Sequence, residues 1–210
     1  MDSYSTTFQS WDKVAALYEA KFMHLELYND SYDKLCDIVA TQSPKVLEIG
    51  CGPGNITRYL LSKRPDLHIE AIDISPNMIQ LAQANNPAAH FRVLDCREID
   101  TIGAVYDVVV CGFCMPYLAV ADCAKLINDI AGLLLDRGIF YFSTIEGAHS
   151  KSGYETGSSG DKMFVYYYDE GFLYKQLELS GFEVVELLKL PYRRTEEEVS
   201  THLIYIARKK

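Results

Sequence analysis

The 210-residue sequence has no apolar run near the roughly 20 residues that cross a bilayer, so no membrane-spanning helix is expected. Residues 1–11 lack the charged and then apolar pattern of a secretory signal. Basic residues are in the minority, with 20 Lys and Arg against 29 Asp and Glu and a formal net charge of −9. A broad basic surface for nucleic acid is therefore not expected. These absences favour a cytoplasmic protein without a membrane or nucleic-acid partner, and they leave the oligomeric state open.

Internal repeats and long blocks of one charge are also missing, while 49% of the residues are hydrophobic. A chain of this length and composition predicts one well-cored domain over 1–210. Most of the cysteines lie in or beside apolar segments, where buried free thiols are commoner than disulfides. The six cysteines are Cys36, Cys51, Cys96, Cys111, Cys114 and Cys123.

Short apolar runs alternate with segments of helical spacing through most of the chain. Such alternation is typical of a parallel sheet covered on both faces. The last two runs have no helix between them, which predicts an antiparallel hairpin at one sheet edge. The predicted fold is α/β, a doubly wound, mostly parallel seven-stranded sheet with an antiparallel C-terminal hairpin and helices on both faces. The expected strands are 45–49, 67–72, 89–94, 106–111, 139–144, 182–190 and 199–208.

Two regions stand apart from this alternation. Residues 11–40 show apolar positions at three- and four-residue steps and predict one or two helices. Residues 146–161 are rich in Gly and Ser and predict a mobile surface loop. A loop of this length is uncommon unless it is functional or disordered.

The strongest local signal is the segment Val46–Gly54, an apolar strand followed by a turn with glycine at every second position. Glycines let the backbone pass close to a ligand, and the helix that follows presents free N–H groups suited to a carboxylate. A dinucleotide fingerprint of the form G-x-G-x-x-G would need glycine at position 55 or 57. These positions hold Asn55 and Thr57, so the spacing does not fit NAD or FAD.

Three further elements follow the next strands in order. Asp73 ends the second strand, nineteen positions after Gly54, where a carboxylate can accept hydrogen bonds from both ribose hydroxyls. Asp95 ends the third strand, where the alternative role is a helix cap. The fourth strand runs into a turn of small residues at Cys111–Cys114, a C-x-x-C spacing. A redox pair or half a zinc site is the alternative for those cysteines, although no second pair completes four ligands.

Taken together, the four elements resemble the motifs of the class I S-adenosylmethionine-dependent methyltransferases, of the type that acts on small molecules. The resemblance covers residues 44–145 well and extends to the C-terminal hairpin. It implies S-adenosyl-L-methionine as the cofactor and no metal. The positions that it implies for cofactor binding are Glu48, Gly50, Cys51, Gly52, Asp73, Ile74, Met78, Asp95, Cys96, Cys111, Gly112, Phe113 and Tyr18.

The resemblance also implies roles for these positions. Glu48 helps to hold the methionine end, Asp73 binds the ribose and Asp95 the adenine amino group. Ile74 covers one adenine face, and residues 111–113 form the floor near the sulfonium. Residues 1–40 are expected to form a helical lid, and 146–168 a loop on the substrate side.

Candidates for acceptor binding are aromatic. Trp11 lies in the predicted lid, Tyr117 follows the fourth strand, and Tyr166 and Tyr168 follow the glycine-rich loop. Each has an alternative as a packing residue. His149 follows the fifth strand and is the one histidine placed where a general base would be useful, although a solvated loop histidine is commoner.

The sequence therefore predicts an enzyme that transfers a methyl group from S-adenosylmethionine to a small-molecule acceptor. No N/D-P-P-Y/F motif of the kind found in amino-group methyltransferases of DNA and protein is present. Two alternatives stay open, a non-catalytic module that binds S-adenosylmethionine and an NAD(P)-dependent oxidoreductase. Another S-adenosylmethionine reaction, such as aminopropyl transfer, is not excluded by the sequence.

Overall fold

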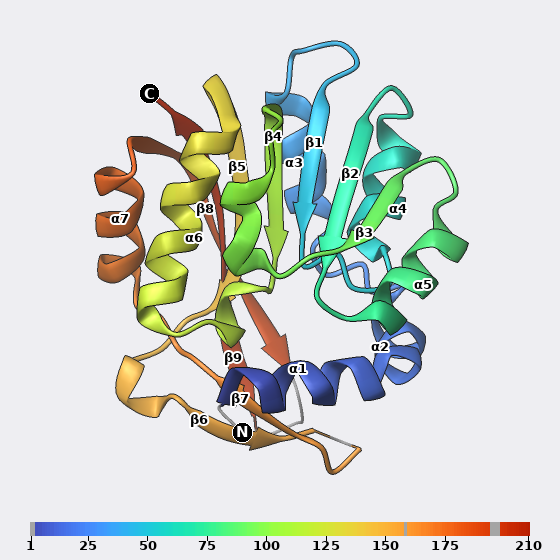
Figure 1. The fold of residues 1–210 in the computed structure, drawn as a ribbon. Helices are drawn as coiled ribbons and strands as arrows, with labels where there is room; N and C mark the ends of the chain where they lie inside the picture. The colour runs from blue at the N-terminus through green and yellow to red at the C-terminus, as the bar shows by residue number, and fades with distance from the viewer. Residues whose placement is uncertain (1–2, 158, 194–197) are drawn as a thin grey trace.

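The computed structural model describes residues 3–157, 159–193 and 198–210. A seven-stranded sheet in the order β3-β2-β1-β4-β5-β9-β8 forms its centre (Figure 1). Strands β1 to β5 are parallel, and β9 pairs antiparallel with both β5 and β8. Its strands are β1 Lys45–Ile49, β2 His68–Asp73, β3 His90–Val93, β4 Tyr106–Gly112, β5 Leu134–Ile145, β8 Phe182–Arg193 and β9 Val199–Lys209.

Helices cover both faces of this sheet, because successive residues of each central strand bury opposite sides. Val46 packs into the core under α3, α4 and α5, whereas Leu47 packs into the core under α6 and α7. Both side chains are at most 1% exposed. The helices are α1 Ser3–Lys13, α2 Ala15–Phe22, α3 Asn29–Ile38, α4 Asn55–Lys63, α5 Pro76–Asn85, α6 Val120–Leu133 and α7 Glu170–Leu179, with 3₁₀ turns η1 Cys96–Thr101, η2 Met115–Tyr117 and η3 His149–Lys151.

The predicted fold class is confirmed, including the antiparallel C-terminal pair and the helices on both faces. The predicted strands agree with the observed ones within a few residues, except that β5 begins at Leu134, directly after α6. The six cysteines are free thiols. In the described part of the chain, no helix combines the length and the apolar character that a membrane span requires.

The prediction of one or two helices over 11–40 is confirmed by α2 and α3, but it missed a preceding helix, so that three helices occupy residues 3–38. The first begins at Ser3 and was hidden by its polar composition. Its buried face includes Thr7 and Ser10, whose hydroxyls bond inside the protein, so the apolar period of this helix is weak. Only α1 and α2 lie beyond the carboxyl edge of the sheet, whereas α3 covers a sheet face against α4 (Figure 1).

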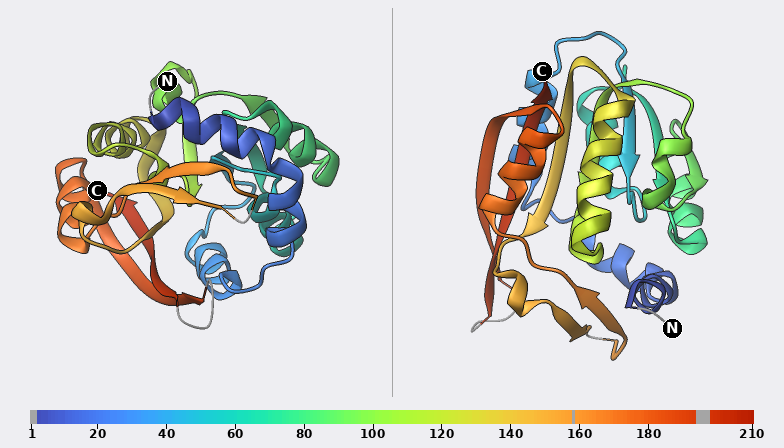
Figure 2. Two further views of the ribbon diagram at one scale, coloured as in Figure 1. Left: turned by 90° about the horizontal axis from the view of Figure 1, so that it is seen from below. Right: turned by 60° about the vertical axis from the view of Figure 1, so that its left-hand side comes forward.

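The prediction of a loop over 146–161 is wrong for the described residues, because they contain regular structure. They form η3 and the first strand of a hairpin, β6 Gly153–Thr156 paired with β7 Lys162–Val165. Met163 and Val165 are buried, and α1 packs along β7. The glycines and serines signalled a turn, but the partner that orders the hairpin lies about 150 residues away in the sequence. Seen from below, α1 and the hairpin lie side by side across the end of the sheet (Figure 2).

Candidate functional site

The glycine turn follows β1 and is fixed to the neighbouring strand. The backbone N–H groups of Gly50 and Cys51 both donate to the carbonyl of Ile72, over 2.8 and 3.0 Å. Gly54 has a φ of 83° and begins α4 as its N-cap. A Cβ there would lie 2.3 Å from the side-chain nitrogen of Asn86, so both the dihedral and the space require glycine.

Asp73 joins this turn to the end of β2. One carboxylate oxygen accepts the N–H of Gly52 and the other accepts the N–H of Ser75, each over 2.9 Å. Burial raises the pKa of this carboxyl, and the two backbone donors act against that rise. Because a carboxylate offers about four lone-pair sites, two remain for a ligand in the pocket that Asp73 lines.

Glu48 lies behind the turn on β1 and is fully buried. One of its oxygens accepts a hydrogen bond from the hydroxyl of Thr57, and the other has no partner among the described residues. Burial raises the pKa of Glu48 from 4.5 to about 8, with the nearby Asp73 adding to the rise. The site therefore contains a buried acid with one unsatisfied oxygen.

This raised pKa predicts a pH dependence of stability. Since the folded pKa exceeds the unfolded value of 4.5, the contribution of Glu48 is full below pH 4.5 and is lost as the pH rises through about 8. We expect the melting temperature of the wild type to fall between pH 5 and 8.5 relative to Glu48→Gln, which carries no charge. Thermal unfolding of both proteins across this range measures the difference. Parallel curves would contradict the assignment.

Two adjoining pockets lie at the carboxyl ends of the strands. They share the residues Tyr18, Gly50, Gly52, Gly112 and Phe113, so they form one continuous site. Eleven of the positions singled out in the sequence line the first pocket, and Cys51 lines the second. The eleven are Trp11, Tyr18, Gly50, Gly52, Asp73, Ile74, Met78, Cys96, Gly112, Phe113 and Tyr117.

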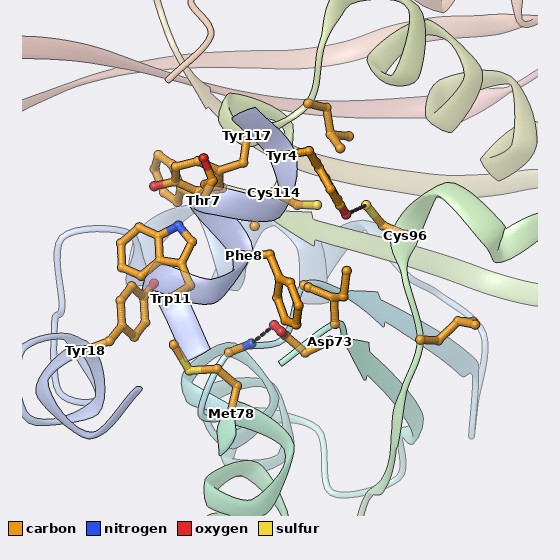
Figure 3. Close-up of a pocket in the computed structure, with 17 residues that line it drawn as sticks. Tyr4, Thr7, Phe8, Trp11, Tyr18, Asp73, Met78, Cys96, Cys114 and Tyr117 are labelled. Atoms are coloured by element: carbon orange, nitrogen blue, oxygen red, sulfur yellow. Dashed lines mark hydrogen bonds between the residues drawn. The ribbon is translucent and has the colours of Figure 1, made fainter. Parts of the chain in front are cut away.

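An aromatic group closes one side of the first pocket. The indole of Trp11 meets the rings of Tyr18 and Tyr117 at centroid distances of 5.4 and 5.3 Å, both with edge geometry. Figure 3 shows these three rings on one side and Asp73 with Met78 on another. The site therefore has an aromatic end and an end that contains a carboxylate.

Helix α1 carries Trp11 and is bonded to two other elements. The hydroxyl of Ser10 donates to the carbonyl of Lys162 over 2.7 Å, and the N–H of Phe164 donates to the hydroxyl of Thr7 over 2.8 Å. On the other side, Asp12 accepts hydrogen bonds from the hydroxyl of Ser75 and the N–H of Asn77. These bonds hold α1 over the pocket between the β6–β7 hairpin and α5.

The end of β4 forms the floor where the two pockets meet. Phe113 takes a left-handed conformation, with φ of 53°, and its N–H donates to the hydroxyl of Ser143 over 3.0 Å. Its ring packs against Tyr28, which lines the second pocket. Cys111 is completely buried beneath this floor and lines neither pocket.

Asp95 takes the arrangement expected of a helix cap. It accepts the N–H of Arg97, pairs with the guanidinium of the same residue and accepts the hydroxyl of Tyr4 over 2.8 Å. Its neighbours Leu94 and Cys96 line the first pocket, whereas Asp95 is not among the lining residues. Of the two roles considered for Asp95, helix cap and adenine ligand, the structure shows the helix cap.

The other predicted candidates lie outside both pockets. His149 is exposed on η3, where its ring stacks on those of Tyr166 and Tyr168. Tyr168 is buried and donates its hydroxyl to the carbonyl of Leu118 over 2.5 Å. The hydroxyl of Tyr166 lies 3.4 Å from that of Ser3. These residues support the hairpin and do not contact the pockets directly.

Several pocket residues escaped the sequence prediction. On α1, Tyr4, Thr7 and Phe8 precede Trp11 at helical spacing, so extending the helical pattern toward the N-terminus would have found them. Leu94, Cys114 and Leu118 also line the pocket. Within the described residues, no group of three or more His, Cys, Asp or Glu side chains is arranged to hold a metal ion.

Residues 46–138 match the family model described as "Methyltransferase domain". Among curated relatives, the malonyl-[acyl-carrier protein] O-methyltransferase of Acetivibrio thermocellus is 31% identical over 112 residues, which cover 52% of this chain and 38% of the relative. The trans-aconitate 2-methyltransferase of Mycobacterium ulcerans is 46% identical over 52 residues, which cover 25% of this chain and 20% of the relative. The matched regions thus span less than half the length of these relatives.

A solved structure resembles nearly the whole chain. The 1,6-didemethyltoxoflavin-N1-methyltransferase of Burkholderia thailandensis superposes with a TM-score of 0.75 at 18% identity. The match covers 98% of this chain and 88% of that one. That structure was determined with 1,6-didemethyltoxoflavin and S-adenosylhomocysteine bound. At this level of identity the likeness concerns the fold.

Proposed function

We propose that the chain is a class I S-adenosylmethionine-dependent methyltransferase that transfers a methyl group from S-adenosylmethionine to a small-molecule acceptor, and the methyltransferase-domain match over residues 46–138 supports this. The observation that carries the proposal is the position of Asp73. Its carboxylate bonds the glycine turn after β1, ends β2 and lines the pocket. Ligands of open α/β sheets bind at this edge, and a carboxylate here suits a ribose diol.

The residues present fit this cofactor. Glu48 has a buried oxygen without a partner among the described residues, beside a turn whose Gly54 excludes a side chain. In the proposal Glu48 serves the methionine end, together with Tyr18 and the backbone of residues 50–52. Ile74, Met78, Leu94 and Cys96 enclose the adenosine end, where they line the first pocket.

When bound, the cofactor supplies a methyl group already activated on a sulfonium. The protein then contributes position and exclusion of water more than acid–base chemistry. The floor residues Gly112 and Phe113, which border both pockets, are proposed to lie under the reacting centre. His149 is exposed and outside the pockets, so the proposal assigns it no base role.

The acceptor side is proposed to lie under the lid formed by α1 and α2, beside the β6–β7 hairpin. Trp11 and Tyr117 are its proposed contacts, and Tyr166 and Tyr168 support it from behind. With a net charge of −9 and no cationic residue among those described as lining the pockets, the proposal includes no nucleic-acid partner. It also places the protein in the cytoplasm.

Calorimetric titration with S-adenosylmethionine tests the cofactor assignment, and absence of binding would overturn it. Incubation with the methyl-labelled cofactor and fractionated small molecules tests transfer. If the cofactor binds and no acceptor is ever labelled, the alternative of a non-catalytic binding module gains support. A titration of nicotinamide fluorescence with NADPH separates the oxidoreductase alternative.

A further inference from the structure

The charge of the pockets restricts the acceptor. Among the described residues that line them, Asp73 alone carries a charge, and it is negative. Glu48, a second acid, lies buried behind the turn. An acceptor with a carboxylate would therefore enter a site in which no described lining residue is cationic. Transfer of an anion from water into such a site is costly, because no positive charge replaces its hydration.

Two cations on or beside α1 already have carboxylate partners. Arg97 forms an ion pair with Asp95 at 2.7 Å, and its guanidinium stacks on the ring of Tyr4 at 3.6 Å. Lys13 pairs with Asp161 at 2.7 Å. Either side chain would have to give up its carboxylate partner to serve an anionic acceptor.

The aromatic end of the first pocket favours a flat ligand. Trp11, Tyr18 and Tyr117 offer edges and faces for aromatic contacts (Figure 3). Phe113 also lines this pocket. The indole N–H of Trp11 is buried and has no hydrogen-bond partner among the described residues. A carbonyl oxygen or ring nitrogen of a bound molecule would supply the missing acceptor.

The lining also lacks a general base suited to a poorly acidic acceptor. Asp73 already accepts two backbone N–H groups, and no histidine or lysine is among the described lining residues. A nucleophile methylated here must therefore hold an available lone pair on arrival. A pyridine-type nitrogen of a neutral heteroaromatic ring meets this requirement, because its lone pair attacks the methyl group without the loss of a proton.

From these observations, and resting on the proposed function, we infer that the acceptor is an uncharged, planar aromatic or heteroaromatic molecule bound beside Trp11 and Tyr117, and not a carboxylic acid. The curated relatives named above act on malonyl and trans-aconitate groups by name, so the inference separates this chain from them in acceptor class.

Binding to the protein saturated with S-adenosylhomocysteine tests the inference without requiring the natural acceptor. Calorimetry compares 4-hydroxyquinoline with 4-hydroxyquinoline-2-carboxylate, and 2-naphthol with 3-hydroxy-2-naphthoate. We expect each neutral compound to bind about tenfold more tightly than its carboxylate, given the cost of an unpaired anion. Trp11 is the one tryptophan of the chain, so its emission reports whether the compound occupies this end of the site.

Two matched variants locate the effect. Tyr117→Arg places a cation at the aromatic end and is expected to remove most of the preference for the neutral compound. Tyr154→Arg adds the same charge on β6, where the tyrosine is 53% exposed and outside both pockets, and is expected to leave the preference unchanged.

Equal or tighter binding of the carboxylates by the wild type would overturn the inference. Failure of both neutral compounds to bind at a concentration of about 1 mM, which suffices to detect weak ligands, would also overturn it. In either case a separate titration of the unliganded protein with S-adenosylhomocysteine shows whether the cofactor site exists. Loss of that binding defeats the proposed function, whereas its presence confines the failure to the acceptor class.

Discussion

Replacing Asp73 with alanine is expected to weaken S-adenosylmethionine binding by about 100-fold, because charge-assisted hydrogen bonds contribute about 1.5–3 kcal/mol each. The same change removes the acceptor for the N–H groups of Gly52 and Ser75, so the glycine turn loses its link to β2. Asp73→Asn keeps one carbonyl oxygen, so its affinity for S-adenosylmethionine should lie between those of the wild type and Asp73→Ala. Calorimetric titration of the three proteins measures the effect.

Asp107→Ala serves as the matched control for this experiment. Asp107 also accepts a backbone N–H, that of Lys45, over 2.8 Å. It lies near the amino-terminal end of β4, at the edge of the sheet opposite to Asp73. Its removal should leave cofactor affinity within about twofold, since no pocket residue is touched. If Asp73→Ala binds as tightly as this control, the carboxylate does not hold the cofactor.

The second large effect is expected at Gly54. Any residue other than glycine there must adopt a φ of 83°, which costs about 1–2 kcal/mol. Its Cβ would also lie 2.3 Å from the side-chain nitrogen of Asn86, so the Asn86 amide must move away. That amide donates to the carbonyl of Gly54 over 2.9 Å in the core, so the substitution also breaks a buried hydrogen bond. We expect Gly54→Ala to lower the free energy of unfolding by about 3 kcal/mol.

Denaturant unfolding of Gly54→Ala beside Gly153→Ala checks this expectation. Gly153 starts β6, is not among the glycines of positive φ, and a Cβ there meets no atom within 4 Å. Its substitution should change stability by less than about 0.5 kcal/mol. A similar loss in both variants would mean that general glycine effects, and not the geometry of the turn, set the result.

The parts of this site that the sequence predicts are those determined locally. Glycines between an apolar run and a helix need their conformations whatever surrounds them, and Asp73 ends a strand whose apolar pattern is clear. Because parallel strands end at one edge, the order of motifs along the chain placed Asp73 and Gly112 in one pocket.

The parts that the sequence did not predict depend on contacts between distant segments. The hydroxyl of Thr7 serves β7, 157 positions away, and this one bond helps to order both α1 and the hairpin. Asp95 illustrates the same limit in part, since its capping bond to Arg97 is local whereas its bond to Tyr4 depends on where α1 lies. In α1 the aromatic residues Tyr4, Phe8 and Trp11 keep a helical spacing, but the buried hydroxyl residues between them weaken the apolar period.

The order of strands in the sheet has a consequence for synthesis of the chain. Strand β9 lies between β5 and β8, so until residues 199–209 arrive β8 has no partner in the sheet and β5 is paired only with β4. On the ribosome, β5 would present an open edge of unpaired backbone groups while most of the pocket residues had already emerged. Completion of the sheet therefore waits for β9, and a nascent chain stalled before this strand presents an unpaired edge of the kind that promotes aggregation.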